Sequence, residues 1–130
     1  MTYYSNKNIS RFKKNFERKY QLQRWQKTGG VMIIGYEMFR NLTGPNKNIR
    51  KAMKETILEC LVDPGADLVV CDEGHLLKNE DTALSKCMRN VKTLRRIVLT
   101  GTPLQNNLIE CKYLIKFIFV VVYFLKIFCI

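Results

Sequence analysis

Apolar residues recur every three or four positions in several parts of the chain, which is the spacing of amphipathic helices. Residues 11–27 form the first such segment, and the double glycine at residues 29–30 marks its end. Further helices are predicted over residues 36–42 and 47–62, and from a cap at Asp81 or Thr82 to about Val91. The aromatic residues at helical intervals in the first segment are Phe12, Phe16, Tyr20 and Trp25.

Three other segments are short, unbroken apolar runs, which are typical of strands covered on both faces. They occupy residues 31–35, 68–71 and 97–100, and the predicted helices lie between them. Strands that alternate with helices pair in parallel through right-handed crossovers. The pattern therefore predicts an α/β fold with a parallel sheet, of which three strands are recognisable here.

The net charge of the chain indicates what kind of partner it could bind. The 130 residues contain 22 Lys and Arg against 11 Asp and Glu, a formal net charge of +11, and the basic residues lie mostly in the first half. Such an excess favours a polyanion, either nucleic acid or an anionic membrane surface, although a solvated helix face accounts for it equally well. The five cysteines form no metal-binding spacing, which fits a reducing compartment.

Candidate chemistry lies directly after the second predicted strand, in the sequence Asp-Glu-Gly-His at residues 72–75. Ligands gather at the carboxyl ends of parallel strands, and an acidic pair there can serve a nucleotide-hydrolysing site. One carboxylate can hold a hydrated Mg²⁺ while the other reaches the attacking water. The alternative interpretation is a solvated loop whose acid caps a helix; the glycine and the imidazole favour function.

A second polar segment follows the third predicted strand, at residues 100–107. Its hydroxyl and amide groups could hydrogen-bond the acidic residues and sense the γ-phosphate of a nucleotide. A polar turn before a helix is the alternative. Two polar strand ends in this order point to a nucleoside triphosphatase core.

Together, residues 72–79 (DEGHLLKN) and 99–107 (LTGTPLQNN) resemble motifs II and III of the Swi/Snf-type chromatin-remodelling ATPases, which belong to the helicase-like superfamily. The resemblance covers roughly residues 18–110. It implies an α/β fold that is a partial recA-like parallel sheet with flanking helices, part of the first helicase lobe.

The resemblance also implies roles for individual residues. Asp72 would coordinate Mg²⁺ and contact the ATP cofactor, Glu73 would polarise the attacking water as general base, and His75 would couple the nucleotide state to motif III. These three residues are the predicted catalytic group.

The resemblance also implies roles for the residues of motif III and for the partners of the protein. By resemblance, Thr100, Gly101 and Thr102 would bind the cofactor and link hydrolysis to DNA movement, and the segment around Tyr36 would lie near the DNA-tracking surface. Members of the family act in the nucleus on double-stranded DNA and on nucleosomes with their histones, and a membrane partner is not expected.

Two departures from the family qualify this expectation. The chain has no Gly-Lys-Thr or Gly-Lys-Ser phosphate loop and no second lobe, so we expect no catalysis by this polypeptide alone. The division expected is a basic helical segment at 1–30, a partial recA-like lobe at 31–110, and an apolar tail at 111–130 that does not belong to the fold. Lys116 and Lys126 interrupt this tail, which is short for a membrane span.

Two other functions are compatible with the residues. One is a non-enzymatic DNA- or chromatin-binding module that uses the basic first half. The other is a small tail-anchored membrane protein.

Overall fold

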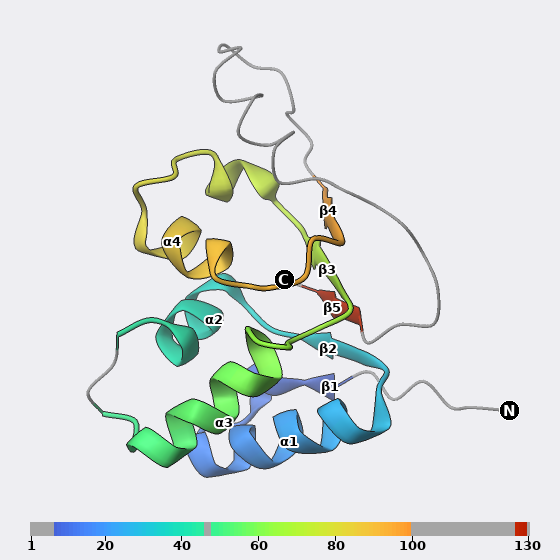
Figure 1. Cartoon of the computed structure of the whole chain (residues 1–130), viewed down its shortest axis with the longest axis vertical. Coiled ribbons are helices and arrows are strands. Elements are labelled where there is room, and N and C mark those ends of the chain that lie inside the picture. The colour runs from blue at the N-terminus through green and yellow to red at the C-terminus, as the bar shows by residue number, and fades with distance from the viewer. Residues whose placement is uncertain (1–6, 46–47, 100–126, 130) are drawn as a thin grey trace, which may run out of the picture.

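A single parallel sheet organises the chain (Figure 1). The structure is a computed structural model that describes residues 7–45, 48–99 and 127–129. The strands lie in the order β1-β2-β5-β3-β4, and every neighbouring pair is parallel. Their bounds are β1 Lys7–Asn8, β2 Val31–Ile33, β3 Leu68–Cys71, β4 Arg96–Val98 and β5 Ile127–Cys129. The predicted α/β class, a partial recA-like parallel sheet flanked by helices, is confirmed.

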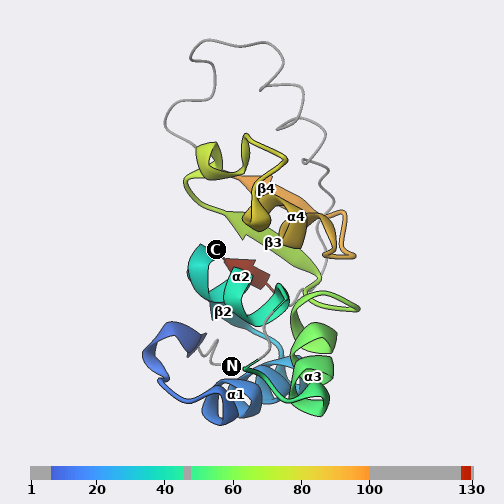
Figure 2. The same ribbon diagram turned by 90° about the vertical axis from the view of Figure 1, so that its left-hand side faces the viewer.

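The α-helices of the described residues pack in a row, with α1 against α3, α3 against α2 and α2 against α4. Figure 2 shows α2 and α4 on the same side of the strands. Two short 3₁₀ turns, η1 and η2, precede α1 and follow β3. The bounds are η1 Ile9–Arg11, α1 Asn15–Thr28, α2 Tyr36–Thr43, α3 Lys51–Leu61, η2 Gly74–Leu77 and α4 Ala83–Arg89.

One continuous apolar core joins the helices to the sheet. The α1 helix contributes Trp25, whose side chain is fully buried and whose indole N–H donates to the Gly30 carbonyl at 2.9 Å. Phe39 of α2 and Met88 of α4 are also fully buried. Burial of such side chains contributes about 1.5–3 kcal/mol each, so this core is what holds β3 and its flanking segments in place. The other fully buried large side chains are Ile9, Leu22, Met32, Ile34, Leu42, Ile57, Leu61 and Val69.

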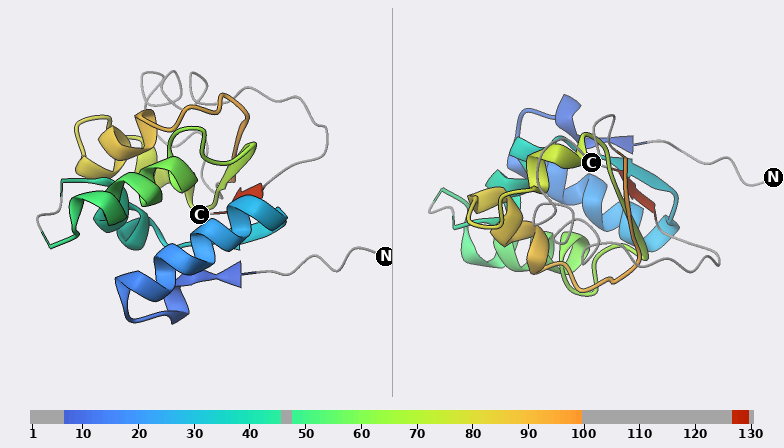
Figure 3. Two further views of the ribbon diagram at one scale, coloured as in Figure 1. Left: turned by 60° about the horizontal axis from the view of Figure 1, so that its bottom comes forward. Right: turned by 90° about the horizontal axis from the view of Figure 1, so that it is seen from above.

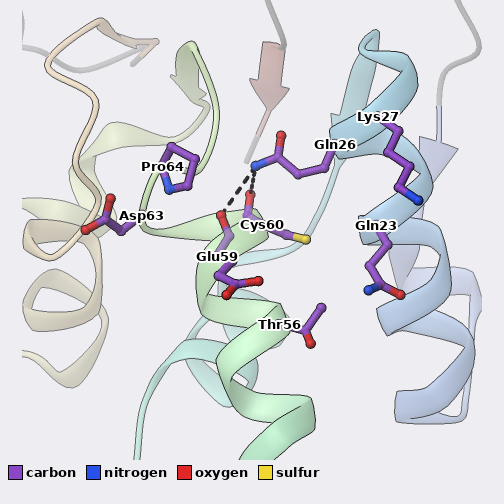
Figure 4. A pocket seen from close by; sticks show the side chains of 8 residues that line it. All are labelled: Gln23, Gln26, Lys27, Thr56, Glu59, Cys60, Asp63 and Pro64. Carbon is purple, nitrogen blue, oxygen red and sulfur yellow. Dashed lines mark hydrogen bonds between the residues drawn. The ribbon is translucent and has the colours of Figure 1, made fainter.

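Side chains from neighbouring elements satisfy the carbonyl groups left over at helix carboxyl ends. Gln26 of α1 is the clearest case: its Nε2 donates to the carbonyls of Glu59 and Cys60 at 3.3 and 3.4 Å (Figure 4). It also donates to the Gly65 carbonyl at 3.0 Å. Lys54 of α3 does the same at the end of α2, since its Nζ donates to the Leu42 carbonyl at 2.6 Å and to that of Gly44. These bonds tie successive helices together.

Burial lowers the pKa values of two cations that donate to backbone carbonyl groups, Lys54 and Arg96. Desolvation lowers the pKa of the Lys54 ammonium, with a smaller opposing contribution from Cys87. Arg96 of β4 is almost fully buried and donates to the Val91 carbonyl at 2.7 Å and the Thr93 carbonyl at 2.9 Å. Desolvation lowers the pKa of Arg96 as well, and Cys71 opposes the shift.

Several predicted bounds differ from the structure at the amino-terminal ends of helices. The helix predicted over 11–27 begins at Asn15, because residues 9–11 form the separate turn η1. The helix predicted over 47–62 is α3, which begins at Lys51. By contrast, β3 has its predicted bounds, and α4 begins where Thr82 Oγ1 accepts a hydrogen bond from the Ser85 amide at 3.1 Å.

The aromatic residues that recur at helical intervals in the sequence do not share one face of α1. Trp25 is fully buried, whereas Phe16 is 71% exposed and Tyr20 is 58% exposed. At 3.6 residues per turn, the nine-residue separation of Phe16 and Trp25 places them about 180° apart around the helix. The buried face is built instead from Leu22 and Trp25, so the two other aromatic rings point outward.

The sheet contains two strands that the apolar pattern did not predict. Strand β1 has only two residues and lies in a polar segment, and β5 falls within the apolar tail and pairs with both β2 and β3. The division at residues 30 and 110 stays a prediction. Most of the tail, 111–126 and 130, lies outside the described residues. Within the described residues, no helix is long and apolar enough to cross a membrane.

We expect Arg96→Met to destabilise the fold by about 2–4 kcal/mol, because two charge-assisted hydrogen bonds are lost and a buried carbonyl is left unsatisfied. The matched control is Arg95→Met, since Arg95 is exposed and its replacement should change the unfolding free energy by less than about 0.5 kcal/mol. Urea denaturation monitored by circular dichroism measures both. Equal midpoints for the two variants would contradict the anchoring role of Arg96.

Candidate functional site

The predicted acidic residues directly follow the carboxyl end of β3, the strand labelled in Figure 1. Asp72 and Glu73 follow Cys71 directly, and the chain then enters the 3₁₀ turn η2. Both acidic side chains and that of His75 are exposed, with 64% of the Glu73 side chain and 45% of the His75 side chain accessible. We call residues 72–75 the acidic turn.

The acidic turn is fixed to the neighbouring strand through its glycine. The Gly74 amide donates to the Leu99 carbonyl at 2.9 Å, and the Leu99 amide donates to the Cys71 carbonyl at 2.7 Å. A Cβ atom on Gly74 would lie only 2.0 Å from Cγ1 of Val98. Glycine is therefore required by the close approach of β4, and the acidic turn is held directly beside the residue that begins motif III.

Glu73 has a backbone conformation that residues other than glycine rarely adopt, with φ 49° and ψ 48°. The conformation costs about 1 kcal/mol or more, and such costs are commonly found at functional sites. It turns the Glu73 amide toward Asp72 Oδ1, which accepts its hydrogen bond at 2.9 Å. It also brings Glu73 Oε2 to 3.2 Å from His75 Nδ1.

A third element, α2, contacts the acidic turn through Tyr36. The Tyr36 hydroxyl donates to the Asp72 carbonyl at 2.6 Å, a contact between residues 36 positions apart. Tyr36 is the first residue of α2. No spacing in the sequence gives a signal for this contact, because the hydroxyl meets a backbone atom and depends on how α2 packs beside β3. Tyr36 therefore joins the predicted residues as a part of the site.

The predicted site residues are only partly brought together by the described structure. Asp72, Glu73 and His75 form one cluster, and Leu99 places the start of motif III against it. The other predicted residues, Thr100, Gly101 and Thr102, lie outside the described residues. The catalytic and cofactor roles of all six stay predictions.

The donor set of the acidic turn fits a hydrated magnesium ion. Asp72 uses Oδ1 for the Glu73 amide, and its other carboxylate oxygen accepts no hydrogen bond from the described residues. Within those residues, no group of three or more His, Cys, Asp or Glu side chains could enclose a metal ion. Mg²⁺ commonly binds through one or two carboxylates together with substrate phosphates, so one free oxygen at an exposed strand end is the appropriate ligand.

A hollow lies between α1 and α3 (Figure 4). Its volume is about 630 Å³, and Asp63 and Pro64, which precede β3, form part of its wall. The acidic turn follows the opposite end of β3, so this hollow belongs to a separate region. The remaining lining residues are Gln23, Gln26, Lys27, Thr56, Glu59 and Cys60.

Comparison with known protein families confirms the family resemblance predicted from the sequence. Residues 2–125 match the SNF2-related domain, which is nearly the whole chain. The chain belongs to the SNF2-related family. This match begins before, and ends after, the segment at 18–110 on which the resemblance was based.

Several individual relatives of this SNF2-related chain carry the name ATRX. The chain is 60% identical to the human transcriptional regulator ATRX over 111 residues, which cover 85% of this chain and 4% of that protein. It is 54% identical to the Drosophila melanogaster ATRX homolog, with 85% and 8% covered. Human helicase ARIP4 is 38% identical over 72% of the chain and 8% of its own length. The chain thus spans less than a tenth of these relatives.

Replacing Gly74 tests the contact that positions the acidic turn in this SNF2-related chain. We expect Gly74→Ala to lower the free energy of unfolding by about 1–3 kcal/mol, because the new methyl group collides with the stiff β-branched side chain of Val98. Gly35→Ala is the matched control: its Cβ would meet only Ser10 Oγ at 4.0 Å, so we expect a change below about 0.5 kcal/mol. Thermal and urea unfolding measure both, and a Gly74→Ala variant as stable as the control would refute the close approach.

Proposed function

We propose that this chain is part of the nucleotide-binding lobe of an ATP-dependent DNA translocase that remodels chromatin. The observation that carries the proposal is the acidic turn, held at a parallel strand end by the Gly74–Leu99 hydrogen bond in a chain of the SNF2-related family. Its partners would be double-stranded DNA and nucleosomes with their histones, and its location would be the nucleus.

The residues of the acidic turn would divide the work between them. Asp72 would hold Mg²⁺ through its free carboxylate oxygen, and the ion, when bound with ATP, would neutralise charge on the phosphates. Glu73 would orient and polarise the attacking water. His75 lies beside the Glu73 carboxylate, where a ring N–H can fix the orientation of that carboxylate.

Motif III would connect this chemistry to DNA. Thr100, Gly101 and Thr102 would respond to the bound nucleotide, and Leu99 ties their segment to the acidic turn. On the other side, Tyr36 ties α2 to the same turn. If the segment around Tyr36 lies near the DNA, a single hydrogen bond would connect the DNA-tracking surface with the nucleotide site.

The residues of this chain alone would not hydrolyse ATP. The 130 residues contain no Gly-Lys-Thr or Gly-Lys-Ser sequence, which would grip the phosphates. Positioning of the phosphates supplies most of the catalysis in phosphoryl transfer. A non-enzymatic DNA- or chromatin-binding role is the second candidate. It is favoured by the net charge of +11.

Measurement of phosphate release with ATP, Mg²⁺ and duplex DNA tests the expected inactivity. We expect the purified chain to release no more phosphate than its Glu73→Gln variant, because both lack the groups that grip the β- and γ-phosphates. DNA-stimulated turnover that disappears in Glu73→Gln would show instead that the chain is an active enzyme.

The metal-binding role of Asp72 has a separate test, because His75 is the only histidine of the chain. Its ring protons give isolated proton NMR signals, and paramagnetic Mn²⁺ held at Asp72 should broaden them. We expect Asp72→Asn to reduce this broadening severalfold. Asp81→Asn, which removes another exposed acid, should leave it unchanged. Equal broadening in both variants would reject Asp72 as the ligand.

A further inference from the structure

The side of α1 that faces away from the core carries an unusual combination of residues. Positions 16, 20, 23, 24 and 27 follow spacings of three and four, so they lie on one side of the helix. All five are exposed, while Leu22 and Trp25 on the opposite side are fully buried. We call this surface the outer face of α1; its residues are Phe16, Tyr20, Gln23, Arg24 and Lys27.

Phe16, Tyr20 and Arg24 are exposed on this face, and Gln23 and Lys27 at the same face also line the hollow between α1 and α3. The left-hand view of Figure 3 shows α1, in blue, in front of the other elements. Phe16 is 71% exposed and Tyr20 is 58% exposed, so two aromatic rings one helical turn apart are open to solvent. Single exposed apolar residues are ordinary, but two adjacent rings on a face that also carries cations indicate a binding surface.

The outer face carries two positively charged side chains that can contact a ligand. Arg24 and Lys27 are exposed, and neither forms an ion pair or a side-chain hydrogen bond with the described residues. Glu17 is the only acidic residue within α1, and it lies at the edge of the face. The face therefore complements a polyanion that also offers flat surfaces to aromatic rings.

We propose that the outer face of α1 binds single-stranded nucleic acid. Phe16 and Tyr20 stack on two successive bases, and Arg24 and Lys27 contact the phosphates that follow. Four residues of helix separate the two rings by about 6 Å along the axis. Bases within a duplex strand are about 3.4 Å apart and their faces are covered, so the rings match an extended, unpaired strand rather than a duplex.

This inference goes beyond the proposed duplex-DNA partner and does not depend on the acidic turn. Fluorescence anisotropy with a labelled oligothymidine of about 12 nucleotides measures it directly on the whole chain. Phe16→Ala with Tyr20→Ala should weaken binding by about 20-fold or more, since each stacked base contributes at least about fivefold. The same variant should bind a duplex of equal length with less than about a twofold change.

Three further variants test whether binding of oligothymidine depends on the ring faces and on the two cations. Phe16→Leu with Tyr20→Leu keeps apolar area but removes the ring faces, so it should lose affinity for oligothymidine as the alanine variant does. Arg24→Gln with Lys27→Gln removes two phosphate contacts and should reduce the salt dependence of binding by about 1.4 units of slope. Leu94→Ala, at another exposed apolar side chain, should change nothing.

Several outcomes would overturn the proposal. They are unchanged oligothymidine binding by the alanine variant, full retention of binding by the leucine variant, and equal losses for oligothymidine, duplex and a polyglutamate peptide. Circular dichroism must show the same helix content in all variants, as exposed positions predict. The Mn²⁺ response of His75 in these variants keeps this test separate from the proposed ATPase role.

Discussion

The close contact between Gly74 and β4 is the constraint on which the candidate site depends. Because Gly74 has no side chain, Val98 can lie where a Cβ atom would otherwise be, and the backbone of Leu99 reaches that of the acidic turn. The contact extends the β3–β4 pairing past the last residue of β3. Any larger residue at position 74 would collide with the Val98 side chain, so that either this side chain or β4 has to move.

Polar side chains perform a second structural task that the small sheet needs. Gln26, Lys54 and Arg96 each donate to carbonyl groups near a helix carboxyl end, and each comes from a different element than the helix it serves. Burying cations is costly, as the lowered pKa values of Lys54 and Arg96 indicate. Unsatisfied carbonyls in the same places would be costly too. The fold thus uses specific tethers, in addition to apolar burial, to set the positions of its helices.

Sequence patterns predicted those parts of the fold that are governed by local chemistry. The bounds of β3 and the cap of α4 at Thr82 follow from an apolar run and a hydroxyl in the right place. Strand β1 was not predictable, since it has two polar residues and exists only through its pairing with β2. The exposure of Phe16 was not predicted because Trp25, on the other side of α1, determines which face is buried.

In the candidate site, too, local features were predictable and contacts between distant segments were not. Its acids were predictable from their position after an apolar run, whereas the contact with Tyr36 arises from packing between distant segments. The glycine requirement at position 74 likewise comes from β4, which is distant in sequence.

Three hydrogen bonds compensate for the strained backbone at Glu73. The Glu73 amide binds Asp72 Oδ1, the Gly74 amide binds the Leu99 carbonyl, and the Tyr36 hydroxyl binds the Asp72 carbonyl. Each contributes about 0.5–1.5 kcal/mol net, so together they are of the same size as the conformational cost of about 1–3 kcal/mol. Contacts within the protein itself therefore offset the strain at Glu73. The backbone of the acidic turn is thus fixed to both β4 and α2, which is the kind of support that a preorganised site requires.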